Sequence, residues 1–322
     1  MPETMRIETP SRLTFSPERH WSRYPAIIVN RDGNYCASWY RYPPPEAAVP
    51  CGIYFCKGSD HLDSIAVGEP VQVTRDGRNH TGAALCQDGA GQYHLAWHCW
   101  PERKGLRYLL LSRSADGLVW SEPVRVLPQI EEYMLYPSVV WHPSGLFWLA
   151  FSVGPGSDFY PAARVFLTSS TDGRSWKPPV PFPQVEPGDN KAALAIMPNG
   201  ELAMTWRRRE GKGHGLCWSA SVDGHRWRDA VRIDVGCSDV DRPKLSADNA
   251  GRLWLSYESN GRIWAGRLDP GRSWAPPQEL ETGAAAESRP SALVQNRSGD
   301  FWLAWTSQRC GTELWAGRML LD

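Results

Sequence analysis

The chain has 322 residues, 42% of them hydrophobic, which is enough to bury one large core or two ordinary ones. Lysine plus arginine and aspartate plus glutamate number 35 each, so no overall charge favours nucleic acid or an anionic membrane surface as the partner. The sequence has no run of about 18 apolar residues and no export signal at its start, so we expect a cytoplasmic protein without membrane spans.

An isolated strand is predicted within residues 10–16 ("SRLTFS"), with no partner close to it in sequence. From residue 20 the chain then repeats itself about every 50 residues. Each repeat has a glycine after a turn-like stretch such as "NRDG" or "MPNG", and an aromatic residue lies six positions later. The glycines are Gly33, Gly91, Gly145, Gly200, Gly251 and Gly299, and the aromatics are Trp39, Trp97, Phe151, Trp206, Tyr257 and Trp305.

Each repeat is predicted to form four short antiparallel strands. Between the glycine and the aromatic residue, apolar residues recur at every second position, which is the period of a strand. A strand such as "YPAIIV" precedes the glycine, and a third strand such as "ARVFLTS" and a fourth such as "EPVRVL" follow the aromatic residue. Four such strands, repeated about every 50 residues, are typical of a β-propeller blade.

The sequence therefore predicts an all-β, single-domain, six-bladed β-propeller. The blades are expected at approximately residues 20–76, 77–129, 130–184, 185–235, 236–281 and 282–322. The sixth repeat ends without a fourth strand, so we expect the strand at 10–16 to complete it and close the ring. Closure in this way leaves no free sheet edge at the seam.

Three repeats contain the phrase Ser-x-Asp-Gly-x-x-Trp, at 114–120, 170–176 and 221–227. It falls in the turn between the third and fourth strands. There the aspartate can accept hydrogen bonds from turn amides, the glycine can take a positive φ and the tryptophan can pack against the hairpin. The phrase thus predicts a structural device rather than a catalytic one. It resembles the Asp-box, or BNR repeat, that the sialidase (neuraminidase) superfamily has on the outer hairpins of its propeller blades.

Function is expected where the ends of the inner strands gather around the central channel, because side chains from all blades converge there. Several arginines are expected near this mouth. A planar guanidinium with five donors suits a carboxylate or sulfate better than a neutral sugar, so we expect an anionic carbohydrate as the partner. The predicted substrate-binding residues are Arg23, Arg41, His98, Arg207, Arg242 and Arg289.

Parts of this pattern are similar to the sialidase superfamily beyond its Asp-box. The segment "SRYPAIIVNRDGNYCASWYR" is similar to the family's opening Arg-Ile-Pro segment, with Arg23 and Arg41 at the places of its arginines. Arg207 matches a carboxylate-binding arginine of the family, and Asp189 or Asn190 stands where the family has a glutamate. The resemblance implies a glycoside hydrolase that acts on a carboxylated sugar.

The residues that would cleave the bond depart from the family pattern. In the sixth blade "SRPSAL" puts Ser288 and Arg289 where the family has its tyrosine nucleophile, and Glu46 is the nearest candidate for its general acid. Hydrolysis needs an acid and a base or nucleophile on opposite sides of the glycosidic bond. The carboxylates expected to supply such a pair are Glu46, Asp189, Asp241 and Glu258.

A second resemblance is to the propeller polysaccharide lyases, carried by "NHTGAALCQDGAGQYHLAWH" and the following "YPSVVW". It implies that His80, His98 and Tyr136 perform β-elimination on a uronic acid, while an arginine neutralises the carboxylate. A glycan-binding propeller without catalysis is the third alternative. Across these alternatives the predicted catalytic residues are Asp189, Asp241, Glu258, His80 and Tyr136.

No motif in the sequence indicates a metal or another cofactor. Phosphate-binding loops, HExxH zinc spacing and calcium loops are absent from the sequence, so we expect no metal or other cofactor to be bound. The eight cysteines are scattered without a pair of CxxC motifs, which favours reduced thiols. Candidates to stack against sugar rings are Trp21, Trp39, Trp100 and Tyr160.

Overall fold

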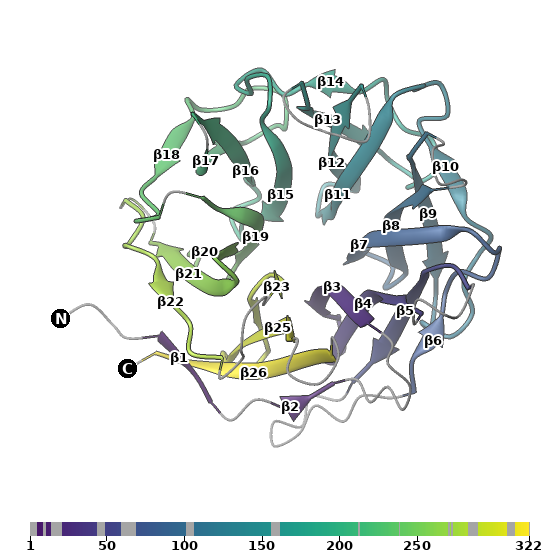
Figure 1. Ribbon diagram of the computed structural model, residues 1–322, viewed down its shortest axis with the longest axis horizontal. Coiled ribbons are helices and arrows are strands. Elements are labelled where there is room, and N and C mark those ends of the chain that lie inside the picture. Colours follow the sequence, from purple (N-terminus) through teal and green to yellow (C-terminus); the bar gives the residue numbers. More distant parts are fainter. Residues whose placement is uncertain are drawn as a thin grey trace.

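The structure, a computed structural model, describes residues 5–8, 11–13, 21–43, 49–58, 69–100, 106–155, 162–211, 213–237, 239–269, 271, 273–282, 289–307 and 313–321. Within these residues the chain forms 26 strands and no helix. The strands lie in six sheets that radiate from a central axis as the blades of a propeller (Figure 1). The predicted all-β, six-bladed architecture is therefore confirmed.

Blades one to five share one plan, in which the first strand is innermost and each later strand lies further out and antiparallel to the strand before it (Figure 1). Blade one contains β3 (Trp21–Val29), β4 (Tyr35–Tyr42), β5 (Gly52–Lys57) and β6 (Val71–Gln72). Blade two contains β7 (Asn79–Gln87), β8 (Tyr93–Trp100), β9 (Tyr108–Ser114) and β10 (Val124–Val126). Blade three contains β11 (Tyr133–His142), β12 (Leu146–Gly154), β13 (Arg164–Ser170) and β14 (Val180–Pro181).

The next two blades follow the same order. Blade four contains β15 (Asn190–Ile196), β16 (Leu202–Glu210), β17 (Gly213–Ser221) and β18 (Val231–Ile233). Blade five contains β19 (Asp241–Ala247), β20 (Leu253–Ser259), β21 (Arg262–Leu268) and β22 (Gln278–Glu279). In every one of these blades the repeat glycine lies in the tight turn between the first and second strands, where its φ is positive.

Blade six is assembled from both ends of the described chain. Its inner position is shared by β23 (Arg289–Pro290) and β24 (Val294–Gln295), followed by β25 (Phe301–Ser307) and β26 (Glu313–Leu321). The N-terminal strands β1 (Met5–Ile7) and β2 (Ser11–Arg12) both pair antiparallel with β26. The predicted closure by an N-terminal strand is thus confirmed, and the pairing begins earlier than residue 10, at Met5.

The hydrophobic core lies between the blades rather than on the axis. The aromatic residues six positions after the repeat glycines are 1% exposed or less in all six blades. Trp97 of blade two, for example, packs with Ile53 and Phe55 of blade one. Because each blade buries its faces against its two neighbours, the core forms a ring, and the inner strands are left to line a central channel.

The Ser-x-Asp-Gly-x-x-Trp hairpins are held by a dense set of local hydrogen bonds. In the first of them Asp116 Oδ1 accepts from the backbone amides of residues 118 and 119 at 2.8 and 3.0 Å, and these bonds lower the pKa of Asp116. Ser114 Oγ accepts from the amide of Gly117 at 2.8 Å. Gly117 has φ of +83°, and a Cβ at this position would lie 2.4 Å from the Phe55 ring. The hairpin therefore presses against the neighbouring blade at a point where only glycine fits.

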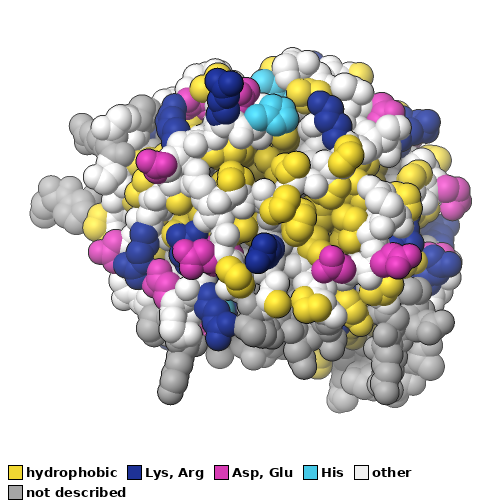
Figure 2. All heavy atoms as spheres, turned by 90° about the horizontal axis from the view of Figure 1, so that it is seen from above, with side chains coloured by type: hydrophobic (Ala, Val, Ile, Leu, Met, Phe, Trp, Pro, Cys, Tyr) yellow, Lys and Arg dark blue, Asp and Glu magenta, His cyan; other side chains and the backbone are white. Residues whose placement is uncertain are grey.

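The outer rim of blade three is apolar and rich in proline. Figure 2 shows the molecule as seen from above the view of Figure 1, and hydrophobic side chains gather in the middle of the face seen there. The edge strand β14 contains Val180, which is 55% exposed, and Pro181, which lacks an amide donor. Proline at an edge strand hinders pairing with another chain. The described part of the chain contains no helix with the length and apolar character that crossing a membrane requires.

Candidate functional site

Each inner strand of blades one to five has a β-bulge close to its start. One residue of each bulge has a left-handed backbone, with φ between 51° and 67°. These residues are Tyr24, Gly82, Tyr136, Lys191 and Arg242. The conformation costs a non-glycine residue on the order of 1 kcal/mol, and bulges commonly re-aim side chains beside functional sites. Four of the five positions accept that cost.

The four non-glycine bulge residues, named here the bulge ring (Tyr24, Tyr136, Lys191 and Arg242), converge on the channel axis. The guanidinium carbon of Arg242 lies 4.9 Å from the centre of the Tyr24 ring, and Lys191 Nζ lies 5.0 Å from the centre of the Tyr136 ring. All four line one cavity of only about 40 Å³. The bulge ring therefore nearly closes the channel at this end, which we call the mouth.

Asp241 is the anion around which the cations of the mouth are organised. Its carboxylate accepts hydrogen bonds from Lys191 and from Arg207 Nη1 (2.9 Å), and it pairs with Arg242 Nη1 at 2.6 Å. Burial alone would raise the pKa of Asp241, but the neighbouring charges outweigh it and hold the pKa well below its usual range. Arg242 Nη1 also lies 2.5 Å from Glu258 Oε2. Both carboxylates are thus engaged in ion pairs, and Asp241 remains ionised.

A second cavity of about 220 Å³ adjoins the bulge ring on the side of blades one to three. We name it the aromatic pocket; it is lined by Tyr24, Tyr40, Tyr42, Thr81, Gly82, His98, Trp100, Arg107, Leu135 and Tyr136. Its volume is below the roughly 300–1,000 Å³ of ordinary ligand pockets. The aromatic walls and small volume suit a single ring such as one sugar unit, since aromatic faces present large apolar surfaces for stacking.

His98 forms part of the wall of the aromatic pocket. Its Nε2 lies 2.6 Å from Thr81 Oγ1, and its ring centre lies 6.0 Å from that of Tyr136. A Cβ on Gly82 would lie 2.3 Å from His98 Cε1, so the ring occupies the space that glycine leaves. Burial lowers the pKa of His98 to about 3, with a contribution from the charge of Arg107. The imidazole is therefore neutral at ordinary pH.

Two further arginines stack on aromatic rings at the mouth. The guanidinium carbon of Arg107 lies 3.8 Å from the centre of the Trp100 ring, and that of Arg289 lies 4.9 Å from the centre of the Tyr24 ring. Neither makes an ion pair with a carboxylate among the residues that the structure describes. Cations therefore exceed carboxylates at the mouth, although the whole chain has equal numbers of basic and acidic residues. The cations are Arg107, Lys191, Arg207, Arg242 and Arg289, and the carboxylates are Asp241 and Glu258.

The structure brings together most of the residues predicted for the site. Those at the mouth or in the aromatic pocket are Tyr136, Asp241, Glu258, His98, Arg207, Arg242 and Arg289. Arg23 lies at the margin, 4.9 Å from the centre of the Trp21 ring. Burial raises the pKa of Tyr40, and the charges of Arg23 and Arg289 oppose that rise, which places both near this wall of the pocket.

Three predicted residues lie elsewhere. His80 is 1% exposed, contacts Asp76 through Nε2 at 2.7 Å and accepts a hydrogen bond from Trp97 Nε1 at 2.8 Å. Asp189 is fully buried and accepts one from Trp206 Nε1 at 3.0 Å. Both precede a bulge residue by two positions, and each fixes the indole of the next strand. They therefore hold the blade together and do not line the pocket.

Arg41 is the third, because its guanidinium carbon lies 4.5 Å from the centre of the Tyr54 ring in the third strand of its own blade. That contact directs it away from the residues of the aromatic pocket. Glu46, Ser288 and Tyr160 lie outside the described residues, so their predicted roles stay predictions. Trp100 lines the pocket, whereas Trp39 is buried between blades.

Sequence reasoning missed Lys191, Tyr24 and Arg107 as parts of the site. The five bulge residues each lie nine positions before a repeat glycine, at 24, 82, 136, 191 and 242. Applying this constant spacing to blade four would have selected Lys191 instead of Asp189. Arg107 has no such signal, because it precedes a third strand, outside the part of the repeat with fixed spacing.

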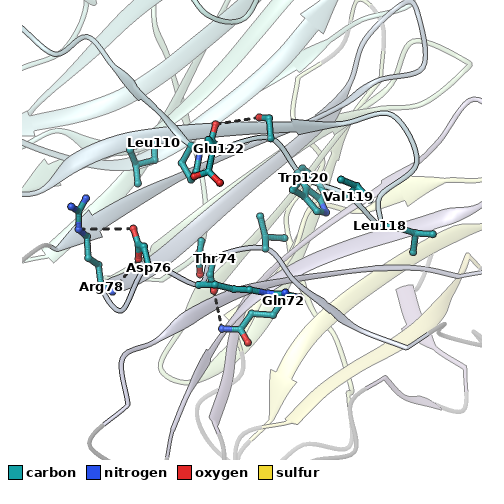
Figure 3. Close-up of a pocket in the computed structure, with 13 residues that line it drawn as sticks. Gln72, Thr74, Asp76, Arg78, Leu110, Leu118, Val119, Trp120 and Glu122 are labelled. Carbon is teal, nitrogen blue, oxygen red and sulfur yellow. Dashed lines mark hydrogen bonds and ion pairs between the residues drawn. The ribbon is translucent and has the colours of Figure 1, made fainter.

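A larger cavity of about 760 Å³ lies between the outer parts of blades one and two (Figure 3). The side chains labelled there include Asp76, Arg78, Trp120 and Glu122, and none of its lining residues belongs to the aromatic pocket. Asp76 pairs with Arg78 and also with His80, so the charged groups of this cavity already interact with neighbouring side chains. We assign the candidate site to the mouth instead, because strained backbone, clustered cations and side chains from several blades coincide there.

The described residues contain no group of three or more histidine, cysteine or acidic side chains arranged to hold a metal ion. The seven described cysteines are free, and six of them are buried. Burial raises the pKa of several of these thiols, including Cys51 to about 11, so they are protonated at neutral pH.

No protein-family model matches the sequence, and no curated protein matches it either. A protein of unknown function from Dyadobacter fermentans superposes with a TM-score of 0.75 at 18% identity, covering 99% of each chain. An α-L-arabinanase from Penicillium chrysogenum gives a TM-score of 0.74 at 15% identity, covering 97% of this chain and 98% of that one. The Hadza microbial sialidase Hz136 gives 0.69 at 15% identity, over 92% of this chain and 65% of that one. The protein thus shares its six-bladed propeller fold with glycoside hydrolases that include sialidases.

Proposed function

We propose that the protein is a sialidase-like glycoside hydrolase that takes a carboxylated sugar or glycoside at the mouth. The observation that supports this best is the local excess of cations on a strained ring of inner-strand residues. Arg107 and Arg289 are the two that make no ion pair with described carboxylates, and both adjoin the aromatic pocket. A substrate carboxylate between them would complete charge-assisted hydrogen bonds, while the sugar ring stacks on the aromatic walls.

The proposed nucleophile is the phenol of Tyr136. Burial and the nearby Asp241 raise its pKa, and the charges of Arg242, Arg207 and Arg107 oppose that rise. Glu258, a carboxylate at the mouth, would take the proton of the hydroxyl as its oxygen attacks the anomeric carbon, and those cations would stabilise the negative charge that develops on that oxygen. Asp241 cannot donate a proton to the leaving group because its pKa is held low. Glu46, predicted from the sequence as the general acid, remains the candidate for that step.

Elimination is a second candidate, favoured by one observation. Tyr136 and the neutral His98 lie edge to face in the aromatic pocket, with ring centres 6.0 Å apart, and Arg107 lines the same cavity. In a uronate lyase an arginine would neutralise the carboxylate, a neutral imidazole would remove the C5 proton and a phenol would protonate the leaving oxygen. The substrate would again be carboxylated, so both candidates need the same cations.

Product analysis separates these reactions. The protein would be incubated with sialosides, glucuronides and uronate polymers, and the products measured by mass and by ultraviolet absorbance. Products that gain the mass of water without new absorbance support hydrolysis, whereas the absorbance of a conjugated double bond establishes elimination. Binding of an acidic sugar without any product would show a glycan-binding propeller and overturn the enzyme proposal. The cytoplasmic location expected from the sequence stays a prediction, which cell fractionation would test.

A further inference from the structure

Beneath the bulge ring the channel is lined by a layer of small side chains with one exception. This layer lies two positions after the bulge position in each inner strand, and in blade six at the matching distance from the repeat glycine. Its members are Ala26, Ala84, Ser138, Ala193, Lys244 and Ala292. All six border one cavity of about 220 Å³, whose other walls include Ile28, Val140 and Val294. Five blades thus leave space on the axis, and the sixth side chain is a long amine.

The Lys244 amine has no counter-ion among the residues that the structure describes. The structure shows no hydrogen bond or ion pair for it among the described residues, and it is the one ionisable side chain on the cavity wall. Burial lowers the pKa of Lys244 to about 8, and the like charge of Arg242 adds to the effect. Asp241, the nearest carboxylate in sequence, already pairs with Lys191, Arg207 and Arg242.

Filling space does not explain a lysine at this position. A methionine would occupy the same length without placing an ammonium among apolar walls, and an unpaired buried charge is costly. The Lys244 side chain is only partly buried, because it borders this open cavity. Ile28, Val140 and Val294, two positions further along their strands, are also partly exposed, so the cavity continues toward the end of the channel away from the mouth.

We propose that this channel is a second ligand site, for a small carboxylate with a short apolar body such as a medium-chain fatty acid. The carboxylate supplies the missing counter-ion of Lys244. The apolar body lies along the small-residue layer and the walls formed by Ile28, Val140 and Val294. The site is distinct from the aromatic pocket, since the two cavities share no lining residue, and the 40 Å³ cavity of the bulge ring shares residues with each of them.

The test is calorimetric titration of the full chain with octanoate and with 1-octanol, which has the same chain but no charge. Wild-type protein is expected to bind octanoate. Lys244→Met is expected to weaken the binding of octanoate at least about tenfold, because the charged contact is removed. The affinity for octanol is expected to stay unchanged or to rise. Ala292→Leu fills the cavity and is expected to weaken both. Lys57→Met, at a lysine 41% exposed on the rim of blade one, is the matched control and should change neither.

Protonation of Lys244 gives a second readout. The charge that acts on the amine is that of Arg242, and the 40 Å³ cavity that both residues border is also lined by Tyr24, Tyr136 and Lys191, none of them an anion. Octanoate affinity should therefore fall as pH rises above about 8, where the free amine loses its proton, and Lys244→Met should remove this dependence. Equal octanoate binding by Lys244→Met, or no binding by the wild type, overturns the proposal.

Octanoate must also be shown not to bind the cations of the mouth. Glucuronate, which is charged but lacks an apolar body, should leave octanoate binding unchanged. Displacement of octanoate by glucuronate would place octanoate at the mouth and overturn the channel proposal, while supporting the proposal that the mouth binds anions. Loss of glucuronate binding in Arg289→Ala with octanoate binding intact would show that the two sites are independent.

Discussion

The residues that line the charged mouth and those that line the apolar channel lie two positions apart along the same inner strands. At the mouth, bulges turn long polar side chains to the axis, and these bond to one another through Asp241. Two residues further the strands are regular, most of the side chains are alanine, and the Lys244 amine is unpaired. Local backbone conformation therefore separates the inner-strand positions whose polar side chains cluster from those that leave space on the axis.

The largest expected effect on the mouth is on turnover. Tyr136→Phe removes the proposed nucleophile and should lower kcat for the preferred acidic glycoside by at least roughly a thousandfold. Binding of the product sugar should change little, because the ring that lines the pocket is kept. Steady-state kinetics and calorimetry would measure the two quantities. Turnover that survives the substitution would remove Tyr136 from the mechanism.

Asp241→Asn tests the mouth as an ion-pair network. The variant leaves Lys191, Arg207 and Arg242 without their shared counter-ion, and its free energy of unfolding should fall by about 3–5 kcal/mol, as for a buried pair that loses one partner. Glu279→Gln, which breaks an exposed pair with Arg262, is the control and should cost less than about 1 kcal/mol. Urea denaturation would measure both.

The same carboxylate predicts a pH dependence. Its pKa is lower in the folded protein than in the unfolded chain, so its contribution to stability is present above the unfolded value and is lost as pH falls below about 4. Denaturation midpoints of the wild type should therefore decline more steeply below that pH than those of Asp241→Asn. Parallel curves for the two proteins would contradict a depressed pKa.

Arg289→Ala should weaken binding of a carboxylated sugar by about ten- to a hundredfold, the usual worth of a charge-assisted hydrogen bond. A neutral sugar of the same ring should bind as before. Arg41→Ala is the matched control, because Arg41 stacks on Tyr54 in the third strand of its blade. Equal losses from both substitutions would indicate a general effect on the propeller and not a carboxylate contact.

Gly82→Ala should destabilise the protein by about 1–3 kcal/mol, since φ is +67° and the new methyl would overlap the His98 ring. It is the one bulge position with glycine, so it reports how tightly His98 is held. Thermal unfolding and the nuclear magnetic resonance signals of His98 would follow the change. An unchanged His98 environment would show that the pocket wall is more adaptable than its packing indicates.

The smallest effect is expected in the channel. Lys244→Met removes an unpaired amine from apolar surroundings and should leave the free energy of unfolding unchanged or raise it by up to about 1 kcal/mol. The opposite signs expected for Lys244→Met and Asp241→Asn are the sharpest form of the contrast between channel and mouth. A large loss of stability in Lys244→Met would mean that the amine has a structural partner.

The blade plan was readable from the sequence because its signals are local and repeated. Gly33, Trp39 and their equivalents mark each tight turn and each buried inter-blade position at fixed spacing. Ring closure was also readable, since one repeat lacked a fourth strand and the N-terminal segment offered one. The start of that pairing at Met5 was not, because a three-residue strand has too short a pattern to stand out.

The site could be predicted only in part from the sequence, because a bulge changes which face of the strand the residues before it occupy. Strict alternation places His80 and Asp189 at the channel, whereas the extra residue in each bulge turns them toward the indoles of Trp97 and Trp206. Lys191, two positions after Asp189, is on the channel face under strict alternation, and it does reach the axis. Asp241 and Arg242 were found because they begin an inner strand, and Arg207 because it directly follows the repeat aromatic Trp206.

The seam of blade six has a consequence for how the chain folds. The pairing of Met5 with Leu321 joins residues 316 positions apart, so the final contact of the ring also has the largest loop to close. During synthesis blades one to five can assemble in order while β1 and β2 wait for β26, the last strand to emerge. We expect the amides of β1 and β2, and those of β26 that pair with them, to be the last to gain protection from hydrogen exchange on refolding.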